Sequence, residues 1–287
     1  MAEANPQTEP GKPVAPTSNN LRLRLTSAVV LIALALGTAW LGGPVFLFAW
    51  TLAALAVWWE WTGIIGVGPR ALLASVGALA ILGMAATLAM NAPAIAFVCA
   101  VIGSGVAAAA ASAYPGRLWA LTGVFYAAAV LVPAVMLRND AAFGLIAILW
   151  LFAVVWAEDT GAYFVGHLIG GPKLAVRISP NKTWSGAVGG TLAGMIAGSA
   201  VVLAAGIAWR PIHLLVAFVI VVAAQFGDLL ESAVKRHFGV KDAGTLIPGH
   251  GGMMDRIDGF LLAAVFALLI GLMRGGAEAP AQGLLVW

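Results

Sequence analysis

The sequence predicts an all-α, polytopic integral membrane protein. Hydrophobic residues make up 62% of its 287 residues and charged residues only 9%, whereas soluble globular domains carry about 25% charged residues. Apolar runs recur along the chain, and many reach the length of about 20 residues that an α-helix needs to cross the hydrocarbon core of a bilayer. A soluble core does not require so many long runs, so the composition excludes a soluble fold.

Nine apolar runs predict nine transmembrane helices with a cytoplasmic N-terminus. The expected spans are residues 25–42, 45–65, 71–90, 93–113, 118–137, 142–166, 184–208, 211–234 and 259–274. Prolines lie at several of the joins, as expected of residues that begin or end helices. We expect four parts: a disordered, proline-rich tail (1–20), N-terminal helices for anchoring and lipid access (21–140), a C-terminal catalytic group (141–275) and a short tail (276–287).

The basic residues set the orientation, because Lys and Arg are enriched in cytoplasmic loops. With a cytoplasmic N-terminus, the nine spans place all of the 15 Lys and Arg on that side except Arg138, Arg210 and Arg274. The polar loops 167–183 and 235–258 then share the cytoplasmic face, where nucleotides are found. We therefore expect a bacterial cytoplasmic-membrane protein with its site on that face. The net charge of +3 does not indicate a nucleic-acid partner.

The first polar group is "WAEDTGAYFVGHLIGGPKLAVRISPNKTWSG", residues 156–186. Asp159, Tyr163 and His167 are spaced by four and share one helix face. That face is either a water-exposed helix end or the edge of a site.

The end of this group is a short polar turn before the next span. Ser179 and Thr183 are expected caps there, and Lys182 and Arg177 add positive charge. Helix N-termini with free N–H groups suit phosphate. The turn therefore predicts a phosphate-binding element, with a basic membrane anchor as the alternative.

Four glycines spaced by four follow in the next span: Gly186, Gly190, Gly194 and Gly198. Small residues at this spacing let two helices approach closely in lipid. We expect packing inside the bundle. The alternative is a seam between two copies, so the spacing also permits a homodimer.

The second polar group begins in "QFGDLLESAVKR". Gln225, Asp228, Ser232 and Lys235 recur every three or four residues and form a polar stripe on an apolar helix. An acid at such a position needs a cation or a hydrogen-bond partner. That cation is either a metal ion or a Lys or Arg of the same chain.

The stretch "PGHGGMMDRIDG" places Asp255 and Asp258 three residues apart at the start of the last span. With Asp228 they supply three carboxylates near one membrane face, and Mg²⁺ prefers such oxygen ligands together with phosphate and water. Gly251 and Gly252 leave room for phosphate to approach the backbone. The surrounding basic residues are Lys235, Arg236, Lys241 and Arg256. Phosphoryl or nucleotidyl transfer requires carboxylates that bind a metal ion and positively charged side chains that bind phosphate.

The segment "SAVKRHFGVKDAGTLIPGHGGMMDRID", residues 232–258, resembles the signature of the phosphatidate cytidylyltransferase (CDP-diacylglycerol synthase) family at every signature position. The upstream Ser-Pro-x-Lys-Thr turn is also similar. The resemblance covers roughly residues 140–275. Asn181 and Ser185 depart from the family's form beside its signature residues, which bears on substrate preference rather than on the reaction.

The resemblance implies that CTP and phosphatidate react to give CDP-diacylglycerol and pyrophosphate, with Mg²⁺ as cofactor. It implies Asp228, Asp255 and Asp258 as catalytic metal ligands and Lys182 as a further catalytic residue. The substrate-binding residues that it implies are Ser179, Asn181, Thr183, Ser232, Lys235, Arg236, Lys241, Asp242, His250, Gly251, Gly252 and Arg256. His250 is expected to donate a hydrogen bond to phosphate, since an ionised phosphate monoester needs no general base.

Other functional classes fit the residues less well. An ion-coupled transporter also has intramembrane acids, but the acids here cluster at one face and no internal repeat is present. A CTP-dependent polyprenol kinase remains an alternative. A CDP-alcohol phosphotransferase would continue "DRIDG" with spaced acids, whereas "FLLAAVFALLIG" follows.

Overall fold

The computed structural model describes residues 18–112, 114–249 and 251–287. Residues 1–17, the larger part of the expected disordered tail, and His250 lie outside the described residues. The elements are α1 (Ser18–Leu41), α2 (Gly43–Ile65), α3 (Arg70–Ala89), α4 (Pro93–Ala110), α5 (Gly116–Asn139), α6 (Gly144–Ile169), β1 (Lys173–Ala175), β2 (Ser179–Thr183), α7 (Trp184–Ala204), α8 (Ile212–His237), α9 (Met254–Gly275) and α10 (Pro280–Leu285).

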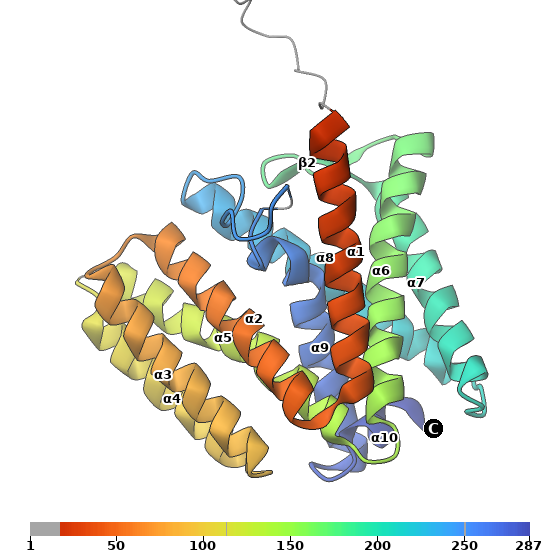
Figure 1. The fold of residues 1–287 in the computed structure, drawn as a ribbon. Coiled ribbons are helices and arrows are strands. Elements are labelled where there is room, and N and C mark those ends of the chain that lie inside the picture. Colours follow the sequence, from red (N-terminus) through yellow and green to blue (C-terminus); the bar gives the residue numbers. More distant parts are fainter. Residues whose placement is uncertain (1–17, 113, 250) are drawn as a thin grey trace, which may run out of the picture.

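The protein is an all-α polytopic membrane protein. Within the described ranges, α1 to α9 are the nine helices long and apolar enough to cross a membrane, and each matches one expected span. The hairpin β1–β2 and the loop between α8 and α9 lie at the same end of the bundle as the start of α1, which we call the loop end; α10 lies at the opposite end (Figure 1). The last span begins at Met254 rather than at residue 259, so Asp255 and Asp258 lie within the helix.

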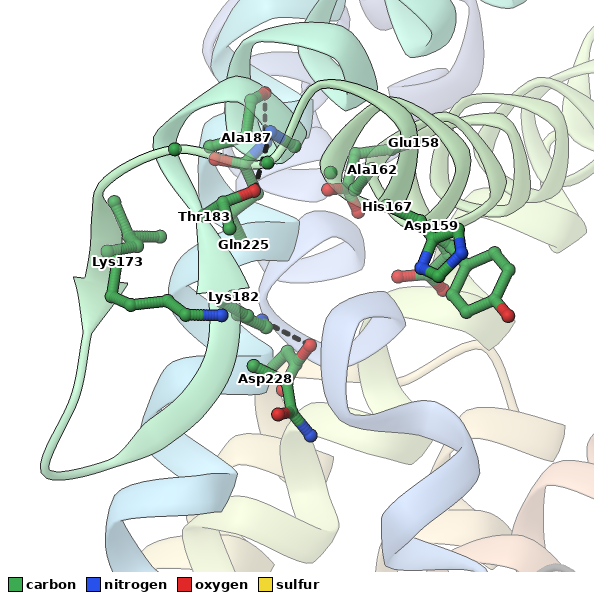
Figure 2. Close-up of a pocket in the computed structure, with 17 residues that line it drawn as sticks. Glu158, Asp159, Ala162, His167, Lys173, Lys182, Thr183, Ala187, Gln225 and Asp228 are labelled. Carbon is green, nitrogen blue, oxygen red and sulfur yellow. Dashed lines mark hydrogen bonds and ion pairs between the residues drawn. The ribbon is translucent and has the colours of Figure 1, made fainter.

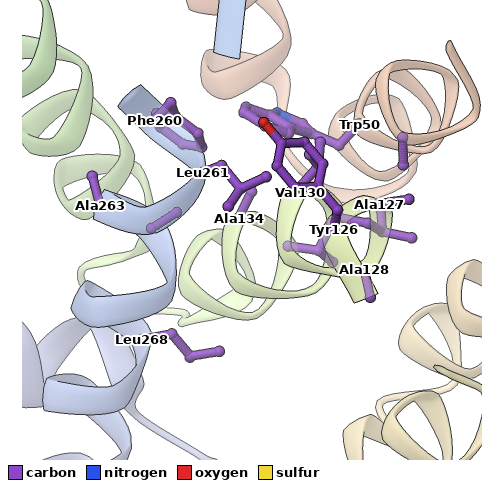
Figure 3. Close-up of a cluster of buried hydrophobic side chains, with 14 of the residues drawn as sticks. Trp50, Tyr126, Ala127, Ala128, Val130, Ala134, Phe260, Leu261, Ala263 and Leu268 are labelled. Atoms are coloured by element: carbon purple, nitrogen blue, oxygen red, sulfur yellow. The ribbon is translucent and has the colours of Figure 1, made fainter. Parts of the chain in front are cut away.

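The N-terminal helices and α9 share one hydrophobic core. Trp50 of α2 packs against Phe260 of α9 with a distance of 4.8 Å between ring centroids. Ala134 of α5 and Leu261 of α9 are also buried in this cluster (Figure 3). The first helices therefore do more than anchor the chain, because they form one wall of the core around α9.

The four glycines of α7 pack against α6 within the same chain. A Cβ atom on Gly190 would lie 2.7 Å from the carbonyl oxygen of Glu158, so no larger residue fits there. Trp150 Nε1 of α6 donates a hydrogen bond to the carbonyl of Gly198 at 3.0 Å. All four glycines are buried. The ridge therefore joins α6 to α7, and a homodimer would have to use another surface.

Two of the three basic residues expected opposite the loop end bind backbone carbonyls. The Arg138 guanidinium donates to the carbonyl of Ala39 at 2.6 Å, next to the end of α1. The Arg274 guanidinium donates to the carbonyl of Val286 at 2.9 Å and lies over the Trp287 ring. Carbonyls near helix ends lack intrahelical partners, so these arginines satisfy local hydrogen bonds. The expected short tail, residues 276–287, contains α10, which packs on α9.

Candidate functional site

A cavity of about 540 Å³ opens at the loop end between α6, the hairpin, the start of α7 and the end of α8. Figure 2 shows Glu158, Asp159 and His167 of α6 on one side and Lys182 of the hairpin on the other, beside Asp228 of α8. The first polar group, residues 156–186, and the second, which begins at Gln225, therefore meet at one place.

The hairpin places Lys182 against Asp228. Strands β1 and β2 pair antiparallel, with Lys173 opposite Thr183. The Lys182 ammonium forms an ion pair with the Asp228 carboxylate, and the two side chains are 27% and 26% exposed (Figure 2). Because solvent reaches both charges, a partly exposed pair of this kind contributes only about 0–1 kcal/mol to stability. Its partners can therefore separate at small cost to bind other charged groups.

Of the two residues in the polar turn that are expected to cap α7, Thr183 does so and Ser179 does not. The Thr183 hydroxyl accepts a hydrogen bond from the backbone N–H of Gly186 at 3.1 Å and so caps α7. Ser179 was also an expected cap, and this prediction is wrong: it lies in β2 opposite Ala175, four residues before the cap. Asn181 lines the cavity from the same strand. The N-terminus of α7 therefore faces the cavity with two expected residues beside it.

The acidic end of α6 forms the opposite wall. Asp159, Tyr163 and His167 all line the cavity and are exposed, so this helix face is both a water-exposed helix end and one edge of the cavity. Asp228 and Lys182 line the same cavity. Glu158 lies beside it and is only 5% exposed.

Asp258 extends this acidic cluster from α9. Its Oδ1 accepts the backbone N–H of Gly259 at 2.9 Å, and its backbone carbonyl packs against Gly227 of α8. The structure therefore brings Asp159, Asp228 and Lys182 together at the cavity and places Asp258 beside the α8 turn that carries Asp228.

Asp255 lies in a separate, internal network. Its Oδ1 accepts from Lys235 Nζ at 2.6 Å, and its Oδ2 accepts the backbone N–H groups of Ala243 and Gly252 at 2.9 and 2.8 Å. Lys235 Nζ also lies 2.7 Å from Oε2 of the fully buried Glu231, close enough for an ion pair but not aligned for a hydrogen bond. This network ties α8, the loop and α9 together.

The other residues that the sequence predicted lie near the site but not on the cavity wall. Ser232 Oγ donates to Asp228 Oδ1 at 3.4 Å, and Arg236 donates to the carbonyl of Val240 at 2.9 Å. Among the described residues, the predicted binding residues absent from the cavity lining are Ser179, Ser232, Lys235, Arg236, Lys241, Asp242, Gly251, Gly252 and Arg256. His250 lies outside the described residues.

The acidic cluster fits a magnesium–nucleotide complex better than a bare ion. In the described part of the chain, no three His, Cys, Asp or Glu side chains are arranged to hold a metal by themselves. Mg²⁺ needs only one or two carboxylates when phosphates and water complete its shell, and Asp228 and Asp258 could supply these. A carboxylate has about four lone-pair positions, and three of those on Asp255 already accept hydrogen bonds.

One buried acid beside this region was missed in the sequence. The Glu60 carboxylate of α2 accepts the backbone N–H groups of Met253 and Met254, both at 2.8 Å. Glu60 is 3% exposed. Its signal was an acid inside the apolar run "LAALAVWWEWTGII", since ionisable residues within spans are functional candidates by default.

Comparison with known proteins places the chain in a family. The model of the cytidylyltransferase family matches residues 22–273. The phosphatidate cytidylyltransferase of Brucella suis is 38% identical over 274 residues, which cover 91% of this chain and 97% of that protein. That of Brucella abortus is 39% identical over 265 residues, 88% and 94% of the two chains. The Bacillus subtilis enzyme of the same name is 44% identical over 131 residues, 45% and 49% of the two chains. The match across nearly all of the spans, together with the site at the loop end, shows that this chain belongs to the cytidylyltransferase family.

Proposed function

We propose that the protein transfers the cytidylyl group of CTP to phosphatidate, giving CDP-diacylglycerol and pyrophosphate. The observation that carries this proposal is the cavity in which Lys182 and the N-terminus of α7 lie beside the carboxylates of Asp159 and Asp228, with Asp258 just outside its lining, where α9 packs on Gly227 of α8. Groups that bind phosphate and groups that bind a divalent cation are thereby within one site. The relatives' names supply the substrates, and the site supplies chemistry that suits them.

The reaction joins two anions, so charge must be neutralised before the reacting atoms can meet. A phosphatidate oxygen forms a bond to the α-phosphorus of CTP, the bond from that phosphorus to the β-phosphate oxygen breaks, and pyrophosphate leaves with the electron pair. Lys182 releases Asp228 and binds phosphate oxygens. Arg256 is the second positively charged residue proposed to bind phosphate. The phosphatidate monoester is already largely ionised near neutral pH, so no side chain need remove a proton.

Asp228 and Asp258 are the proposed ligands of Mg²⁺, whereas Asp255, the third ligand that the sequence predicts, holds Lys235 and the turn before α9. When bound, Mg²⁺ neutralises phosphate charge and stabilises the leaving pyrophosphate. The chain's own part is to keep the carboxylates in place, and Lys235 does so for Asp255. The acyl chains of phosphatidate stay in the bilayer while its headgroup reaches the cavity.

The proposed reaction has a direct assay that separates it from its alternatives. Purified protein in detergent receives phosphatidate, Mg²⁺ and CTP labelled at either the α- or the γ-phosphate. We expect α-label in the lipid product, γ-label in pyrophosphate and no turnover with EDTA. In a parallel reaction with a polyprenol in place of phosphatidate, transfer of γ-label to the polyprenol would identify a lipid kinase instead. Absence of both CDP-diacylglycerol and pyrophosphate would refute cytidylyl transfer.

We also propose that the loop end faces the cytoplasm of a bacterial cell, because most Lys and Arg residues lie there. Thr245 is exposed in the loop between α8 and α9. In a Cys99→Ser background, Thr245→Cys should resist an impermeant thiol reagent in intact cells and react after lysis. A cysteine in place of the exposed Glu278, near α10, should react in intact cells. The reverse pattern would invert the orientation.

A further inference from the structure

Glu60 supplies the N-terminal cap of α9 from a different helix. The first N–H groups of a helix have no intrahelical partner, and α9 has no cap from the side chain of its own N-cap residue, Met253. Glu60 Oε1 accepts the N–H of Met253 and Oε2 that of Met254, both at 2.8 Å. The partners are 193 and 194 residues apart in sequence. A carboxylate on N–H groups at a helix N-terminus is a strong, charge-assisted arrangement.

The backbone around this cap is packed directly against the carboxylate. A Cβ atom on Gly252 would lie 2.5 Å from Glu60 Oε1, and one on Gly244 would lie 2.9 Å from the same atom. A side chain at either position would push the Glu60 carboxylate out of its present place, so glycine at both positions lets the loop wrap around Glu60. The Glu60 carboxylate is the nearest group to a Cβ atom placed on either glycine.

Glu60 and Asp255 together fix the turn that leads into α9. Asp255 Oδ2 holds the N–H of Gly252, and Glu60 holds those of the next two residues. Three consecutive backbone N–H groups are therefore bound by two buried carboxylates. The same short segment carries Asp258, whose backbone carbonyl packs directly against Gly227 of α8, the residue before Asp228.

We infer that Glu60 is a positioning residue for nucleotidyl transfer, acting through the start of α9 to hold Asp258 beside Asp228. The inference rests on the proposed function. It gives the first helices a part in the reaction, because Glu60 belongs to α2 and its helix is held against α9 by the contact between Trp50 and Phe260. A misplacement of about 1 Å at reacting groups can cost about 10²-fold in rate, so loss of this cap should act mainly on turnover.

The chain contains a matched control at the opposite end of the bundle. Asp140 Oδ1 accepts the N–H groups of Ala142 and Phe143, both at 3.0 Å, just before α6. Asp140 is 5% exposed, against 3% for Glu60. Both are buried carboxylates on two successive N–H groups near a helix start, and Asp140 Oδ2 also accepts the N–H of Gln282 in α10 at 2.9 Å. The connection between α5 and α6, which carries Asp140, lies with α10 at the end away from the cavity (Figure 1). A purely structural cap should behave alike at both places.

The test compares Glu60→Gln, Glu60→Asp and Asp140→Asn in the full-length protein in detergent. We expect similar falls in melting temperature for Glu60→Gln and Asp140→Asn. In Glu60→Gln, the kcat of the folded fraction should fall about 10²-fold, with little change in the KM for CTP. In Glu60→Asp, kcat should partly recover. In Asp140→Asn, kcat should stay near the wild-type value. An unchanged kcat in Glu60→Gln, or an equal loss in Asp140→Asn, would overturn the inference.

A second measurement does not depend on activity. Amide hydrogen exchange of residues 251–258 should accelerate in Glu60→Gln and remain at the wild-type rate in Asp140→Asn. Unchanged exchange in Glu60→Gln would refute the positioning role even if the wild-type protein catalysed another reaction. Wild-type protein without cytidylyl transfer, but with the expected exchange pattern, would instead refute the proposed function alone.

Discussion

Asp228→Asn is expected to lower kcat by about 10³-fold while the protein remains folded in the membrane. Asp228 is the residue at which the two polar groups meet: it pairs with Lys182 and accepts a hydrogen bond from Ser232. It also follows Gly227, which packs against the backbone of Asp258. A metal site contributes several kcal/mol of transition-state stabilisation, and each 1.4 kcal/mol corresponds to a factor of ten in rate. The measurement is steady-state turnover of CTP and phosphatidate across a range of Mg²⁺ concentrations.

Related variants locate the metal ligands around Asp228. Asp258→Asn should raise the Mg²⁺ concentration needed for half-maximal activity. Asp255→Asn should also stop turnover, because it disturbs the bonds to Lys235 and to two backbone N–H groups. The exposed Glu278, at the opposite end, provides the control, and Glu278→Gln should leave kcat unchanged. Near-normal turnover in Asp228→Asn would remove this residue from the proposed metal site.

Lys235→Met is expected to lower the free energy of unfolding by about 3–5 kcal/mol, the usual result of removing one member of a buried ion pair. Lys235 lies between Glu231, which is fully buried, and Asp255, which is 8% exposed. Methionine preserves most of the volume of the side chain but leaves two buried carboxylates without their cation. Equilibrium unfolding in mixed micelles measures the loss, independently of any effect on substrate binding.

Glu231→Gln tests the same network with the opposite expectation. Glu231 has no aligned hydrogen bond among the described residues, and Lys235 keeps Asp255 as its partner when Glu231 is neutral. We therefore expect little change in stability from Glu231→Gln alone and a partial rescue of Lys235→Met by its addition. If adding Glu231→Gln restores none of the stability lost in Lys235→Met, this double-mutant cycle would show that Glu231 and Lys235 do not interact measurably.

The number of helices and the gathering of polar loops at one end followed from the sequence because each rests on local composition. Apolar length fixes a span, and the alternation of spans brings residues 167–183 and 235–258 to one end. Thr183 was predictable as a cap for the same reason: its hydrogen-bond partner is three residues away.

The missing parts of the site depend on contacts between distant segments. Glu60 could be recognised as an unusual acid, but its partners lie 193 and 194 residues further along the chain. The separation of Asp255 from Asp258 was equally hidden, since a spacing of three predicts a shared face without saying which neighbour each oxygen meets. The place of Ser179 in β2, rather than at a helix cap, was not predictable either, because this strand forms only by pairing with β1.

The glycine contact between α6 and α7 constrains how a lipid can travel. Where the backbones lie so close that a single methyl group on Gly186 or Gly190 would collide with a carbonyl oxygen of α6, a fatty-acyl chain is too wide to pass between the two helices. These two helices thus act as a closed wall toward the hydrocarbon region. A diacyl substrate must approach the cavity by another flank of the bundle, and its two tails must remain outside that wall throughout the reaction.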